Sequence, residues 1–281
     1  MPDPGRPAPR GLRAVVRRLR PAPAQPRAKA ATDYGFVVVV APGRSGSTLI
    51  QGMLNEIPGT LVRGENNLYL YGIYQAYRDF LAFQELHRSN RHRQLISPFY
   101  GLMELRKGMW VRFVRNLFVT GALGAESSEQ VQRLGFKEVL WHRVTADDTE
   151  GFFGFLDAAL PGVRYILNTR DPEVVVGSGF WTGQDREKAI AKVERVHDIQ
   201  AFLRATRPDR VYETRYEVVT GEDVAARDAQ LSGLIEFVTG EPASRDVLTS
   251  VAAALDTGYG PHPFGESRND GLGATPPPSE A

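Results

Sequence analysis

The fold is decided by the stretch Phe36-Val-Val-Val-Val40-Ala-Pro-Gly-Arg-Ser-Gly-Ser-Thr48. Its five leading apolar residues, four of them β-branched, predict a strand buried on both faces, as in a parallel sheet. A Gly- and Ser-rich turn follows, and then a helix that ends at Pro58-Gly59. The apolar residues of that helix recur at helical spacing, at Leu49, Met53, Leu54 and Ile57.

Strand-like and helix-like segments alternate through the rest of the chain. Strands are also expected at 60–63, 134–137, 163–169 and 210–215. Helical segments are expected at 66–88, 99–120, 152–160, 185–205, 222–239 and 243–256. Such alternation implies an α/β fold whose central parallel sheet has about five strands and right-handed crossovers.

Composition divides the chain of 281 residues into a folded body and two tails. Residues 1–33 hold seven of the 19 prolines and carry a net charge of about +6, whereas the remaining residues carry about −5. We expect a disordered basic tail at 1–33, a single domain at 34–262 and a flexible tail at 263–281. The alternative for the basic tail is a short amphipathic helix that contacts a membrane surface.

Several classes of protein are excluded by what the sequence lacks. The chain has no cysteine, which rules out disulfide scaffolds, iron–sulfur clusters and thiol catalysis. No apolar run approaches the length of a membrane-spanning helix, and the N-terminus has no secretory h-region. We therefore expect a cytoplasmic protein, and the Ala-, Arg- and Gly-rich composition indicates a bacterium. The acidic body disfavours nucleic-acid binding.

The turn at Gly43-Arg44-Ser45-Gly46-Ser47-Thr48 is suited to an anion. After a buried strand, the backbone N–H groups of such a turn and the following helix N-terminus point at the ligand. The turn is not a Walker A loop, because no lysine follows Gly46. It can still hold one phosphate, with Arg44 donating from its guanidinium and with hydroxyls from Ser45, Ser47 and Thr48. The alternative is a surface turn without a ligand.

A second phosphate site is indicated at Arg170-Asp-Pro-Glu-Val-Val-Val-Gly-Ser178. Arg170 follows a predicted strand, at the sheet edge where open α/β proteins bind ligands. Ser178 lies eight residues later. Two monophosphate sites without a metal motif indicate a ligand that carries phosphates at different positions.

Together these two segments resemble the cofactor motifs of the sulfotransferases that use 3′-phosphoadenosine 5′-phosphosulfate (PAPS). The resemblance implies that Gly43–Thr48 binds the 5′-phosphosulfate and that Arg170 and Ser178 bind the 3′-phosphate. Leu134-Gly-Phe-Lys137-Glu138 is similar to the family's central strand with its lysine, and Arg215-Tyr216-Glu217 to its late Tyr-Glu motif near the nucleotide. The similarity covers about residues 36–240 and implies a P-loop-type three-layer fold.

The branch of the family is indicated by Arg44 and by the residues near Lys137. Cytosolic phenol and steroid sulfotransferases have lysine in the loop and a Lys-x-His pattern, but here Val139 stands where the histidine would be. The chain is closer to the tyrosylprotein and carbohydrate-type branch and its bacterial relatives. That resemblance implies that Glu65 is the catalytic base, with His142 as the reserve candidate.

The resemblance implies an enzyme of EC 2.8.2 type, a sulfotransferase that moves a sulfuryl group from PAPS to a hydroxyl of a carbohydrate, lipid or natural product. Arg44, Glu65 and Lys137 would be catalytic, Tyr216 would join the cofactor site, and no metal is expected. The expected partner is a small-molecule or glycan acceptor, with no nucleic acid and at most peripheral membrane contact through the basic N-terminus. The oligomeric state stays open. The alternatives are a P-loop kinase with a degenerate loop and a non-catalytic nucleotide binder.

Aromatic and basic residues crowd the two predicted helices at 66–88 and 99–120. The aromatic residues between 69 and 83 either pack in the core or form a stacking wall for an acceptor. The arginines between 88 and 115 either form a solvated face or steer an anionic acceptor.

Overall fold

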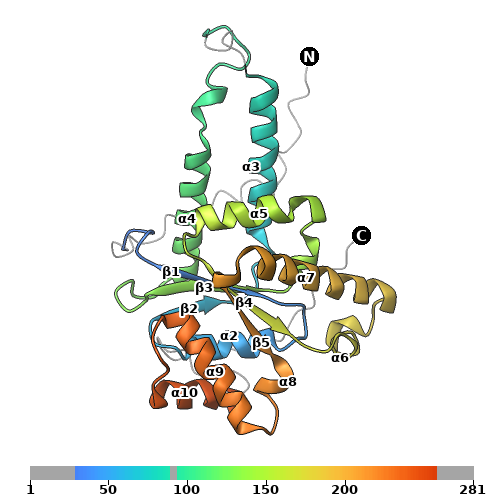
Figure 1. Ribbon diagram of the computed structural model, residues 1–281. Helices are drawn as coiled ribbons and strands as arrows, with labels where there is room; N and C mark the ends of the chain where they lie inside the picture. The colour runs from blue at the N-terminus through green and yellow to red at the C-terminus, as the bar shows by residue number, and fades with distance from the viewer. Residues whose placement is uncertain (1–28, 89–93, 258–281) are drawn as a thin grey trace, which may run out of the picture.

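The computed structural model describes residues 29–88 and 94–257, and these form an α/β fold around a five-stranded sheet (Figure 1). The strands lie in the order β2-β3-β1-β4-β5, and every pair is parallel. Their bounds are β1 Gly35–Val40, β2 Thr60–Arg63, β3 Arg133–Glu138, β4 Arg164–Thr169 and β5 Val211–Arg215. The predicted fold class and all five predicted strands are confirmed.

Helices cover both faces of the sheet, and β1 shows why. Phe36, Val38 and Val40 face one core, to which α3, α4, α5 and α7 contribute. Val37 and Val39 face the other core, which includes α2, α9 and α10. Successive side chains of a strand point to opposite faces, so a strand between two helical layers is apolar throughout. The main helices are α2 Ser47–Asn55, α3 Tyr69–Leu86, α4 Lys107–Leu123, α5 Ala146–Ala159, α7 Arg186–Thr206, α9 Val224–Thr239 and α10 Arg245–Thr257.

The predicted helix at 152–160 was too short at its start. Helix α5 begins at Ala146, because the Thr145 side chain caps it by accepting a hydrogen bond from the Asp148 backbone N–H at 3.3 Å. Two short helices, α6 Pro172–Val176 and α8 Tyr216–Val219, follow β4 and β5. The predicted helix at 99–120 is divided into a 3-10 turn, η2 Leu102–Glu104, and α4.

Helices α3 and α4 extend beyond the sheet as a two-helix arm (Figure 1). At its base, Tyr71 and Tyr74 are buried against Phe152, so these aromatic residues pack in the core, as the first of the two alternatives predicted. Asp148 of α5 fastens the arm, since it accepts hydrogen bonds from Tyr71 Oη at 2.7 Å and Arg78 Nη1 at 2.5 Å.

The expectations for the two tails concern, in large part, residues 1–28 and 258–281, which lie outside the described residues. Within the described ranges, no helix is long and apolar enough to cross a membrane.

Candidate active site

The loop between β1 and α2 gathers backbone hydrogen-bond donors, with Arg44 and Thr48 exposed, Gly46 half-buried and Ser47 buried. Arg44 adopts a φ of 67°, which is uncommon for a residue with a side chain, and Gly46 a φ of 83°. No side chain caps α2. Across 29–88 and 94–257, no group accepts a hydrogen bond from the backbone N–H of Gly46, Ser47 or Thr48. These donors at a helix N-terminus are available to an anion.

Buried polar groups hold this loop from beneath. The Ser45 hydroxyl donates to the Pro42 carbonyl at 2.7 Å, and Asn168 Nδ2 of β4 donates to the Ser45 carbonyl at 2.7 Å. Asn168 Oδ1 accepts from the Thr214 hydroxyl at 2.9 Å, and Gln200 of α7 donates to the Asn168 carbonyl at 3.1 Å. Ser45 is fully buried, so its hydroxyl stabilises the loop and does not face solvent.

Arg170 and Tyr216 lie beside the same loop. The Arg170 guanidinium donates to the Arg44 carbonyl at 2.9 Å and stacks on the Tyr216 ring, with Cζ 4.1 Å from the ring centroid. Tyr216 in turn packs against Gly46, where an added Cβ would lie 2.3 Å from the ring. Glu217 accepts a hydrogen bond from the Asp171 N–H at 3.1 Å, which ties the end of β5 to the end of β4.

The segment after α6 also contacts the loop between β1 and α2. Trp181 Nε1 donates to the Gly43 carbonyl at 3.0 Å, and a Cβ on Gly179 would lie 2.5 Å from Arg44 Nε. The Ser178 hydroxyl donates to the Val175 carbonyl at 3.0 Å, so its single proton is engaged within the protein in this conformation. The two predicted phosphate motifs therefore share one region.

Lys137 and Glu65 form an ion pair at the ends of neighbouring strands. Lys137 Nζ lies 2.5 Å from Glu65 Oε1, and the two side chains are 5% and 49% exposed. Lys137 is in β3, and Glu65 lies two residues after β2. Glu65 Oε2 has no hydrogen-bond partner among the described residues. One oxygen of the carboxylate thus binds the lysine while the other stays accessible.

Glu138, the residue after Lys137, holds the Glu65 loop in place. Its fully buried carboxylate accepts from the backbone N–H groups of Asn66 at 3.1 Å and Leu68 at 2.8 Å. The other oxygen accepts from Val139 at 2.8 Å and Leu140 at 3.1 Å. A buried carboxylate with four donors links the end of β3 to the loop that carries Glu65.

His142 lies in η3 (Leu140–Arg143), just after β3. It is half-buried, and its ring packs edge-on against Trp181 with centroids 6.5 Å apart.

Burial raises the pKa of the Tyr69 phenol, at the start of α3, to about 12. Tyr69 therefore remains neutral near pH 7.

The sequence-predicted residues form two contacting sets: Arg44 and Gly46 with Arg170 and Tyr216, and Glu65 with Lys137. Sequence reasoning missed the supporting groups Asn168, Gln200, Trp181 and Glu138. Asn168, which directly follows the buried run Tyr165–Leu167 of β4, was the one visible signal, since buried polar side chains need partners. None of the described residues forms a cluster of three or more His, Asp or Glu side chains suited to a metal.

Comparisons with known proteins give matches among solved structures alone. No protein-family model and no curated protein matches the chain. A solved structure, the sulfotransferase domain of the olefin synthase from Synechococcus PCC 7002, is 20% identical, with 84% of each chain covered and a TM-score of 0.48. A likeness this distant says nothing about what the present chain binds or transforms.

Proposed function

We propose that this protein is a PAPS-dependent sulfotransferase that transfers a sulfuryl group to a hydroxyl of a carbohydrate, lipid or natural product. The observation that carries the proposal is the Lys137–Glu65 ion pair at the same strand edge as an uncapped anion loop. Arg44 in that loop and Glu65 as a base match the pattern of the tyrosylprotein and carbohydrate-type branch.

The site residues fit a ligand with two separate phosphate groups. The N–H groups of Gly46, Ser47 and Thr48, together with the Arg44 guanidinium, would hold the 5′-phosphosulfate. Arg170 would hold the 3′-phosphate, and Ser178 would join it by turning its hydroxyl from the Val175 carbonyl to donate to the phosphate. Because Tyr216 fills the space beside Gly46, it limits where the nucleotide lies along the loop.

Glu65 is suited to take a proton from the acceptor. When bound, PAPS supplies the sulfuryl group that the acceptor oxygen attacks. Glu65 Oε2 has no donor in the described part of the chain and belongs to a half-exposed side chain, so an acceptor hydroxyl can donate to it. A positioned general base contributes about 10²–10⁴-fold to the rate.

Lys137 is suited to stabilise negative charge at the oxygen that leaves sulfur. Its ammonium group is nearly buried, and burial strengthens its interaction with nearby charges. Contact with Glu65 keeps the ammonium at the strand edge. Fixed cations of this kind stabilise transferring groups in related chemistry.

A P-loop kinase is the second candidate from the sequence, and the structure offers no observation that favours it. A kinase would need Mg²⁺ and would lose activity in EDTA. A sulfotransferase with this site should keep its activity in EDTA.

The test of the proposed function is transfer from PAPS labelled with ³⁵S to extracts that contain glycans, lipids and small hydroxyl compounds. We expect a labelled product with the wild-type protein, with and without EDTA. Glu65→Gln should form little product, because its amide cannot accept the proton. Transfer of phosphate from ATP, inhibited by EDTA, would instead establish the kinase.

A further inference from the structure

The outer half of the α3–α4 arm exposes an unusual amount of apolar surface. Twelve large apolar side chains are exposed in the described part of the chain, and ten of them lie between residues 83 and 117. At the outer end of the arm, Leu86 is 79% exposed and Ile96 90% exposed. Gathered exposed apolar residues mark a surface that contacts another component.

Along α4 the apolar residues form a stripe. Met109, Phe113 and Leu117 are exposed and lie four residues apart, so they share one face of the helix. The opposite face, with Val114 and Phe118, is buried in the body. Helix α4 is therefore apolar on its outer face as well, which packing among residues 29–88 and 94–257 does not explain.

Cations border this apolar surface. Arg106, Lys107 and Arg112 are exposed, and none has an ion-pair partner within 29–88 or 94–257. The described part of 69–123 has six Arg or Lys and three Asp or Glu residues, on a body whose net charge is about −5. Positive charge is thus concentrated on the arm, and it complements an anionic partner.

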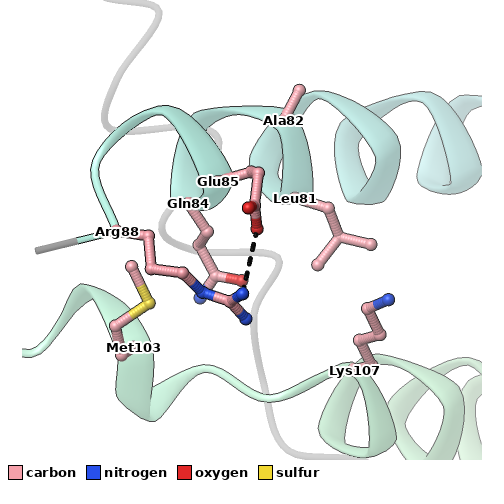
Figure 2. Close-up of a pocket in the computed structure, with 7 residues that line it drawn as sticks. All are labelled: Leu81, Ala82, Gln84, Glu85, Arg88, Met103 and Lys107. Carbon is pink, nitrogen blue, oxygen red and sulfur yellow. Dashed lines mark ion pairs between the residues drawn. The ribbon is translucent and has the colours of Figure 1, made fainter.

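A pocket of about 340 Å³ lies between α3 and the start of α4 (Figure 2). Figure 2 shows Arg88 and Lys107 on its two sides, with Leu81 and Met103 in the lining. Glu85 Oε2 lies 3.7 Å from Arg88 Nη1, in an ion pair. A lining of this kind, cationic and apolar together, suits the boundary between lipid phosphates and acyl chains.

We propose that the outer half of the arm, residues 83–88 and 94–117, docks on an anionic membrane surface. Surfaces with apolar residues and adjacent Lys or Arg bind there through apolar burial and attraction to anionic lipids. Pairing of two identical arms would bring like charges together, because a two-fold interface is self-complementary. The basic residues 1–28 add attraction to the same surface. This inference does not depend on the reaction that the protein catalyses.

The experiment is flotation of the full-length protein with vesicles of phosphatidylcholine, alone or with about one third phosphatidylglycerol. We expect binding only to the anionic vesicles, and a loss of binding as the ionic strength rises from about 0.1 M to 1 M, because the screening length shortens from about 10 to 3 Å. Arg106→Gln with Lys107→Gln should lower the partition coefficient about tenfold to thirtyfold.

Matched variants distinguish the contribution of the arm to vesicle binding from that of the rest of the surface. Lys188→Gln with Arg245→Gln removes the same charge from α7 and α10 and should leave binding nearly unchanged. Phe113→Glu should weaken binding, whereas Val224→Glu, an exposed apolar site on α9, should not. Equal binding of the arm and control variants would overturn the proposal, as would absence of binding by the wild type. A dimer in solution that Phe113→Glu dissociates would overturn it in favour of self-association.

Discussion

At the scale of single residues, the central contact is the one between Glu65 and Lys137. A lysine that is 5% exposed is costly to bury as a charge unless a partner compensates it, and Glu65 supplies that partner. The pair also brings together a carboxylate and a cation, the two groups that the proposed transfer to a hydroxyl requires.

We predict that Glu65→Gln lowers the turnover number by about 10²–10⁴-fold and leaves nucleotide binding intact. Glutamine keeps the shape and still accepts a hydrogen bond from Lys137, but it cannot take the acceptor's proton. Turnover at saturating PAPS is the measurement, with His142→Ala as the comparison. A near-normal Glu65→Gln enzyme and an inactive His142→Ala enzyme would make the histidine the base.

Arg170→Ala is predicted to weaken PAPS binding far more than it slows the bound reaction. Its guanidinium would contact a phosphate that does not react, so the contribution is nearly equal in the ground and transition states. We expect the Michaelis constant for PAPS to rise by about tenfold or more, as for loss of a charge-assisted hydrogen bond. Arg245→Ala, on the exposed start of α10, is the control.

At the scale of elements, Glu138 connects two strand ends and is a positioning residue for Glu65. Glu138→Gln replaces one acceptor oxygen with an NH₂ group, so buried N–H donors lose their partner. We predict a loss of about 1–3 kcal/mol of stability. In addition, the turnover number should fall while the affinity for adenosine 3′,5′-bisphosphate is unchanged. Lower stability with normal turnover would show that Glu138 is structural only.

Asp148 fastens the arm to α5, and its ion pair predicts a pH dependence. Burial alone would raise the pKa of Asp148, but hydrogen bonds from Arg78 and Tyr71 outweigh it and hold the pKa below the ordinary 3.8. The stabilisation is therefore complete above about pH 4 and is lost as the pH falls through the lower folded pKa. Asp148→Asn should cost about 1.5–3 kcal/mol at pH 7.

Urea denaturation of the wild type and of Asp148→Asn, at pH 7 and at low pH, tests the contribution of the Asp148 ion pair to stability. The stability difference between the wild type and Asp148→Asn should shrink in acid, because the wild-type carboxyl then becomes protonated. A difference that is independent of pH would show that the ion pair does not contribute.

The position of β1 was predictable because Val37–Val40 are apolar and buried on both faces of the sheet. Strand β5 is mostly half-buried or exposed, and its position followed from the alternation of strands and helices. The loop and its anion-binding donors followed from glycine and serine after such a strand. The partner of Lys137 was not predictable, because Glu65 and Glu138 are both near it in the folded sheet and only the structure separates them. The arm's apolar surface was also missed, since periodicity does not reveal which face meets solvent.

At the scale of the whole molecule, the parallel sheet brings distant segments to one edge. Loops after β1, β2, β3, β4 and β5 meet there, as expected for the carboxyl ends of parallel strands. Two sets of cations result, one at Arg44 and Arg170 and one at Lys137. A ligand with two phosphate groups makes full use of the first set.

The measurement that tests this account most directly compares adenosine 3′,5′-bisphosphate with AMP in thermal unfolding. At about a hundred times its dissociation constant, the bisphosphate should add about 2.7 kcal/mol, or about 5–10 °C in Tm for a domain of this size. AMP at the same concentration should add much less, and Arg170→Ala should remove most of the difference. Equal shifts with AMP and the bisphosphate would contradict the 3′-phosphate site and, with it, the proposed use of PAPS.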